Sequence, residues 1–141
     1  GQSPVSAESA LQKLLDGNAR YVSAGPAYPN QTVERRTEII KGQHPFAIIV
    51  GCSDSRVPPE IIFDQGLGDL FVVRLAGHVL NDEALGSIEY AVEHLGTRLV
   101  MVLGHDRCGA VTAVVQGGEA PGHIGSIFNA IAPAVQKAKE C

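Results

Sequence analysis

Three residues of the sequence could bind a soft metal ion together, and each stands directly after a run of apolar residues. Cys52 follows residues 45–51, and His105 and Cys108 follow residues 99–104. Continuous apolar runs of this length are typical of strands that are buried on both faces. The carboxyl ends of parallel strands meet at one edge of a sheet, so we expect the three side chains to converge there. Two thiolates and one imidazole predict a zinc site whose fourth position is open to water.

The competing interpretation is an ordinary buried cysteine or a hydrogen-bonded core histidine, which would explain any one of these residues alone. The coincidence of all three at strand ends favours the metal site. A structural zinc site has four protein ligands, and Cys141, the last residue of the sequence, is a poor candidate for the fourth. A water molecule in that position would have its pKa lowered to about 7, which supplies hydroxide at neutral pH.

Asp54 and Arg56 lie next to Cys52 and are two residues apart, so in an extended chain they point to the same side. A guanidinium keeps a neighbouring carboxylate ionised and orients it through two hydrogen bonds. Asp54 would then accept a proton from metal-bound water. Alternatively, with Arg56 turned away, Asp54 binds the metal as a fourth ligand and closes the site. A solvated surface ion pair of little energetic consequence is the third possibility.

Apolar strands alternate with helical segments along the chain, which predicts an α/β fold with a parallel-sheet core covered by helices on both faces. We expect an N-terminal helical arm and loop over residues 1–44 and the zinc-binding core over residues 45–141, within a single domain. The expected strands are residues 45–51, 70–76 and 98–104, of which the first and the third are expected to be buried. The expected helices are residues 6–23, 32–41, 59–63, 82–94, 108–116 and 126–139.

Composition narrows the class of protein. The chain has 141 residues, of which 45% are hydrophobic, enough for one well-packed domain. Its net charge of −4 and the lack of a basic cluster argue against nucleic-acid binding, and no apolar run approaches the roughly 20 residues that cross a membrane. Three cysteines favour a reducing compartment, the cytoplasm, over a disulfide framework. The first residues lack the pattern of a signal peptide, although a targeting segment that has been removed stays possible.

The pattern Cys52-x-Asp54-x-Arg56, followed by His105-x-x-Cys108, resembles the β-class carbonic anhydrases. Further segments resemble that family in the same order, at residues 71–74, 87–91 and 104–109. The resemblance implies zinc-dependent, reversible hydration of carbon dioxide to bicarbonate and a proton by zinc-bound hydroxide. It implies that Cys52, His105 and Cys108 are the zinc ligands and that Asp54 and Arg56 form the catalytic dyad.

The same resemblance implies substrate-binding roles for Gln43, Phe71 and Tyr90, with some of the aromatic pocket residues coming from a partner subunit. Without it, Phe71 and Tyr90 would be ordinary core residues. It also implies a homodimer or a multiple of dimers, because family members wrap the N-terminal helical arm over a neighbour. Two histidines, His44 and His78, are candidates to carry protons, or else serve as surface or packing residues.

Two departures from the family pattern affect these expectations. Bicarbonate-regulated members resemble one another at a second site built from a tryptophan at the position of Ile49 and an arginine at that of Arg74. This chain has no tryptophan, so we expect an open metal site. The family domain usually continues past the position of Cys141 with a strand and helices, so we expect that C-terminal part of the fold to be absent.

Two other functions stay open on the sequence. The same fold and metal could serve a hydrolase of carbonyl sulfide or carbon disulfide, since the access route rather than the ligands would select the substrate. A noncatalytic zinc-binding assembly module is the second alternative.

Overall fold

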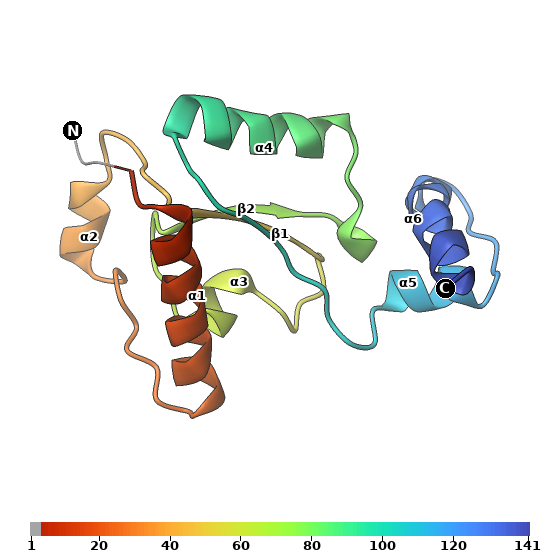
Figure 1. The fold of residues 1–141 in the computed structure, drawn as a ribbon, viewed down its shortest axis with the longest axis horizontal. Helices are drawn as coiled ribbons and strands as arrows, with labels where there is room; N and C mark the ends of the chain where they lie inside the picture. The colour runs from red at the N-terminus through yellow and green to blue at the C-terminus, as the bar shows by residue number, and fades with distance from the viewer. Residues whose placement is uncertain (1–3) are drawn as a thin grey trace.

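The computed structural model describes residues 4–141. Its elements follow the expected alternation of helices and strands (Figure 1). They are α1 (Ala7–Val22), α2 (Val33–Glu38), β1 (Ala47–Gly51), α3 (Pro59–Ile62), β2 (Leu70–Arg74), the 3-10 helix η1 (Ala76–His78), α4 (Asp82–Leu95), β3 (Val100–Val102), α5 (Gly109–Val115) and α6 (Ile124–Lys139).

The three strands form one parallel sheet in the order β2-β1-β3. Strand β1 is central and every one of its residues is buried, which explains its unbroken apolar sequence. Figure 1 shows α4 on one face of the sheet and α1 with α3 on the other. The predicted α/β architecture, a parallel sheet between layers of helices, is therefore confirmed.

The prediction that residues 98–104 form a buried strand was wrong in part. Strand β3 is only three residues long, and Val100 and Val102 are 43% and 67% exposed. Because β3 lies at the edge of the sheet, only its Met101 side packs against the core cluster, while the face of the two valines is open. An apolar run predicts burial of both faces but carries no information about strand order.

Helix α1 covers its face of the sheet as its sequence pattern predicts. The Ser6 hydroxyl accepts a hydrogen bond from the backbone N–H of Ser9 at 3.1 Å and caps the helix. Ala10 and Leu14 are fully buried and belong to the same core cluster as Ile49. Part of the apolar face of α1 is therefore buried against the sheet of its own chain.

Gly17 of α1 lies against the backbone at the end of α3. A side-chain carbon at this position would collide with the backbone carbonyl of Phe63, an atom that a rotamer change cannot move. We expect Gly17→Ala to lower the free energy of unfolding by about 1–3 kcal/mol, the usual cost of overpacking. Urea denaturation followed by circular dichroism measures this change.

Gly86 provides the matched control, because it lies in the exposed part of α4 with open space around it. Gly86→Ala should raise the free energy of unfolding by roughly 0.5–1 kcal/mol, since alanine restricts the unfolded chain. A Gly17→Ala protein as stable as the wild type would contradict the packing of α1 described above.

Helix α4 begins and ends at the residues that its sequence predicts. The Asn81 side chain accepts a hydrogen bond from Ala84 at 2.9 Å at the start of α4, and Gly96 ends that helix in the left-handed conformation, with φ 70°. Helices α5 and α6 pack together beyond the carboxyl ends of the strands (Figure 1). Within residues 4–141, no helix combines the length and the apolar character needed to cross a bilayer.

Candidate metal centre

Two buried cysteines meet at the carboxyl edge of the sheet. Cys52 directly follows β1, and Cys108 directly precedes α5; they are 5% and 6% exposed. Their Sγ atoms lie 3.9 Å apart. Two thiolates bound at about 2.3 Å to one tetrahedral zinc would be about 3.8 Å apart, so the spacing of this pair fits a shared metal ion.

His105, which follows β3, brings an imidazole to the same place. Its Nδ1 lies 2.9 Å from the carbonyl oxygen of Asp106, and its Nε2 lies 3.9 Å from a carboxylate oxygen of Asp54. Nε2 is buried, and nothing in the described part of the chain hydrogen bonds to it. A proton on Nδ1, donated to the carbonyl, leaves the Nε2 lone pair free for a metal ion.

The two side chains also shift each other's protonation. Burial raises the pKa of the Cys52 thiol, but the neighbouring His105 side chain and backbone N–H groups, that of Gly77 among them, outweigh this and lower the pKa to about 7. The neighbouring Cys52 thiol raises the pKa of His105, against the effect of burial. A thiol that ionises near neutral pH is prepared to bind a metal ion.

Asp54 and Arg56 form a closely hydrogen-bonded pair beside the cysteines. The guanidinium donates to both carboxylate oxygens, Nε to Oδ1 at 2.9 Å and Nη2 to Oδ2 at 2.6 Å, and the backbone N–H of Arg56 donates to Oδ1 at 2.9 Å. Nη2 also donates to the carbonyl oxygen of Arg107 at 3.1 Å, which ties the pair to the segment after β3. The hydrogen bonds from Arg56 hold the pKa of Asp54 well below its usual range. The carboxylate is thus occupied by Arg56.

Arg74, the last residue of β2, organises the backbone of the site. Its Nε donates to the carbonyl oxygen of Cys52 and its Nη2 to that of Asp54, both at 2.6 Å. The resemblance associated this residue only with a second bicarbonate site, so its positioning role was not predicted. A single arginine at the end of an otherwise apolar strand was the available signal.

One group of side chains close enough to share a metal ion includes a residue that was not predicted as a ligand. One donor atom from each of Cys52, His78 and His105 lies within 4.8 Å of the other two. Cys108 lies outside this group but contacts Cys52 directly. A sequence signal existed, because His78 follows β2 as Cys52 follows β1 and His105 follows β3.

The three predicted substrate-binding residues do not join the metal cluster. Gln43 is exposed and precedes β1, so the length of that strand, roughly 16 Å, separates it from Cys52. Phe71 and Tyr90 contact each other between β2 and α4, with ring centres 6.2 Å apart, and Tyr90 is 46% exposed. The structure therefore shows an aromatic pair, but within one chain it does not join Gln43 to the cysteines.

The sequence matches a family model described as carbonic anhydrase over residues 47–141. It is 50% identical to a carbonic anhydrase of Mycolicibacterium smegmatis over 131 residues, 90% of this chain and 64% of that one. Carbonic anhydrase 2 of Mycobacterium tuberculosis is also 50% identical, over 90% of this chain and 63% of that one. The chain thus spans slightly less than two thirds of the length of these relatives.

The fold agrees with solved structures of the same kind. A Coccomyxa β-carbonic anhydrase in complex with acetazolamide superimposes with a TM-score of 0.69 at 27% identity, covering 92% of this chain and 60% of that one. A β-carbonic anhydrase of Aspergillus fumigatus gives a TM-score of 0.68 at 29% identity, covering 94% and 62%. The strand-end cysteines, the parallel sheet and these matches lead to one conclusion: the chain belongs to the carbonic anhydrase family and has the fold of its β class.

Proposed function

We propose that the protein catalyses the zinc-dependent, reversible hydration of carbon dioxide to bicarbonate and a proton. The observation that carries this proposal is the close Cys52–Cys108 pair with His105, beside an Asp54 carboxylate that Arg56 holds through two hydrogen bonds. The names of the relatives agree with it. The assignment applies to the activity of the whole protein, of which residues 47–141 match the family model.

Cys52, His105 and Cys108 are the proposed zinc ligands. The donor set fits zinc, since two thiolates and an imidazole are soft-to-borderline ligands, and the sulfur spacing suits a tetrahedral ion. When bound, zinc lowers the pKa of a water molecule to about 7 and so supplies a nucleophile at neutral pH.

Asp54 and Arg56 are the proposed catalytic pair. Oδ2 of Asp54 lies 3.9 Å from Nε2 of His105 and is the carboxylate oxygen nearest to that proposed ligand atom. This oxygen would accept a hydrogen bond from the group that gives up a proton and would so hold that group in a fixed orientation. Arg56 keeps the carboxylate ionised and fixes its plane through two parallel hydrogen bonds. Because both carboxylate oxygens accept hydrogen bonds from Arg56, this pairing supports an open metal site to which Asp54 is not bound.

Phe71, Tyr90 and Gln43 are the proposed substrate-binding residues, and we propose that a second copy of the chain completes the pocket. An aromatic pair suits a nonpolar gas, while Gln43 can reach a metal centre only across an interface, given its distance along β1. The exposed apolar side chains of α1 support a homodimer or a multiple of dimers: Leu11, Leu15 and Val22. A stable monomer in multi-angle light scattering would contradict this assembly.

The cytoplasm is the proposed compartment. All three cysteines are free, and the proposed ligands Cys52 and Cys108 must stay reduced to bind a metal ion.

A stopped-flow measurement of carbon dioxide hydration, run beside a zinc determination, tests the proposed function. We expect about one zinc per chain and a hydration rate that disappears on zinc removal and returns when zinc is restored. Zinc at full stoichiometry without hydration at any pH would instead favour a noncatalytic module. Sulfide release from carbonyl sulfide in the absence of carbon dioxide hydration would favour the hydrolase.

A further inference from the structure

We propose that a cavity sharing no residue with the metal centre binds a small aromatic amine, through both its ammonium group and its ring. The cavity has a volume of about 600 Å³ and lies between the end of α1, the loop that follows it, and α3. A volume of this size and a mainly apolar lining with a few polar groups are typical of small-molecule sites. The lining residues are Tyr21, Ala24, Pro26, Tyr28, Gln31, Glu60, Ile61 and Asp64.

The apolar part of the lining is largely aromatic and open to solvent. Tyr21, Tyr28 and Ile61 are 44%, 64% and 61% exposed, so they form an apolar wall that the rest of the described chain does not cover. Tyrosine rings offer faces on which another aromatic ring stacks and to which a cation is attracted. The wall therefore favours a ligand with a flat, apolar body.

A buried carboxylate fixes the loop that carries Tyr28. Asp64 is 3% exposed, and its carboxylate accepts a hydrogen bond from the guanidinium of Arg20. The same carboxylate accepts hydrogen bonds from the N–H of Ala27 at 2.8 Å and from that of Tyr28 at 3.1 Å. The loop is thus tied to α1 and to the end of α3 before a ligand arrives, which reduces the cost of ordering it on binding.

Three residues that line the cavity have a left-handed backbone conformation. Ala24, Tyr28 and Asp64 have φ angles of 57°, 52° and 46°. They are half of the six non-glycine residues with positive φ in the described part of the chain. Such conformations cost free energy, are maintained by their surroundings, and cluster where proteins hold ligands. Their concentration around one cavity indicates a preformed site.

Glu60 gives the cavity its negative charge. Arg20 compensates the charge of Asp64, whereas Glu60 forms no ion pair with the described part of the chain. Gln31 adds an acceptor, because its Nε2 donates to the carbonyl oxygen of Gln65 at 3.3 Å and leaves the amide oxygen to a ligand. A carboxylate and an amide oxygen select a ligand that carries positive charge and donates hydrogen bonds, as an ammonium group does.

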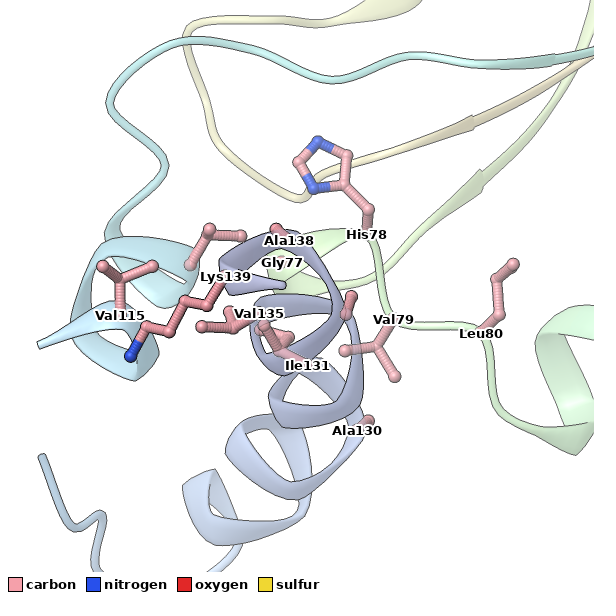
Figure 2. Close-up of a pocket in the computed structure, with 12 residues that line it drawn as sticks. Gly77, His78, Val79, Leu80, Val115, Ala130, Ile131, Val135, Ala138 and Lys139 are labelled. Carbon is pink, nitrogen blue, oxygen red and sulfur yellow. The ribbon is translucent and has the colours of Figure 1, made fainter. Parts of the chain in front are cut away.

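The groove formed by η1, α5 and α6 has the opposite charge and selects against the same ligand. Figure 2 shows this groove lined mostly by apolar side chains, with the cationic Lys139 among them. None of its described lining residues is acidic. An ammonium group would be repelled there, so the two cavities of this chain can be told apart by the charge of the ligand that each accepts.

Benzylammonium, benzyl alcohol and benzoate share one ring and differ in charge, so titrating each into the ¹⁵N-labelled protein tests the inference by NMR, independently of activity. We expect benzylammonium to bind with a dissociation constant on the order of 1 mM and to shift the amide signals of Ala24, Tyr28 and Glu60. Benzyl alcohol should bind at least about threefold more weakly, and benzoate should leave these signals unchanged. Nα-acetyl-lysine amide carries the ammonium group on the alkyl stem of a protein side chain and should also bind at least about twofold more weakly, because it has no ring.

Glu60→Gln and Tyr28→Asn each remove one part of the site and should weaken benzylammonium binding about twofold to fivefold. Asparagine tolerates positive φ, so the second variant keeps the backbone of the loop. Glu93→Gln is the matched control, because it removes the same charge from the exposed surface of α4 and should leave the affinity unchanged.

Three results would overturn the inference: equal affinity for benzyl alcohol and benzylammonium, unchanged affinity in Glu60→Gln, or amide shifts in η1 and α6 in place of the loop and α3. Tighter binding of Nα-acetyl-lysine amide than of benzylammonium would overturn the assignment of a small aromatic amine and indicate a protein lysine as the ligand.

Discussion

Replacing Cys52 with serine is expected to abolish zinc binding and carbon dioxide hydration together. Cys52 belongs to both sets of neighbouring donor atoms at the site. Its Sγ lies 3.9 Å from Sγ of Cys108, and it also belongs to the group with His78 and His105. A serine hydroxyl does not ionise near neutral pH and is a poor ligand for zinc. Without zinc, no group of the site produces hydroxide at pH 7, so the rate should fall to the uncatalysed background.

The measurements are zinc content by atomic absorption and stopped-flow hydration on the same sample, with circular dichroism as a check on the fold. Cys141→Ser is the matched control, because Cys141 is exposed and its thiol hydrogen bonds to the carbonyl oxygen of Lys137, away from the cysteine pair. It should retain zinc and activity. Full hydration activity in a zinc-free Cys52→Ser protein would refute the proposed mechanism.

Asp54→Asn is expected to lower kcat by about 10²–10⁴-fold while the protein keeps its zinc, the range associated with a positioned acid–base group. The substitution is nearly isosteric but removes the negative charge that Arg56 holds. An amide N–H₂ in place of Oδ2 would face the Arg56 donors, so the side chain would rotate and lose its orientation. The pKa of Asp54 lies well below its usual range, so the wild-type group is ionised throughout the assay range and its removal is the whole effect.

Asp106→Asn is the control for Asp54→Asn, because Asp106 is exposed and contacts His105 only through its backbone carbonyl. We expect kcat within about twofold of the wild type, the behaviour of a surface substitution away from the chemistry. Loss of zinc from Asp54→Asn would show that Asp54 is a metal ligand in the resting protein. Unchanged kcat would remove Asp54 from the mechanism.

The sequence could predict the helices, strands and proposed ligands that depend on local patterns. Ser6 and Asn81 cap helices because a side-chain oxygen needs only a backbone N–H three residues away. The apolar run of β1 reflects burial on both faces of one strand. Cys52 was predicted as a ligand because parallel strands present their carboxyl ends at one edge, and this holds for any order of strands.

The strand order and the neighbours of each side chain were decided by tertiary structure. Val102 is exposed because β3 forms the edge of the sheet, although its sequence resembles that of β1. His78 joins Cys52 and His105 because β2 lies next to β1 and Gly77 fits against α6. Such contacts join residues far apart in sequence and depend on packing between elements, which no local pattern encodes. The sequence therefore predicted the chemical type of the metal site, and the tertiary structure added a second histidine beside it.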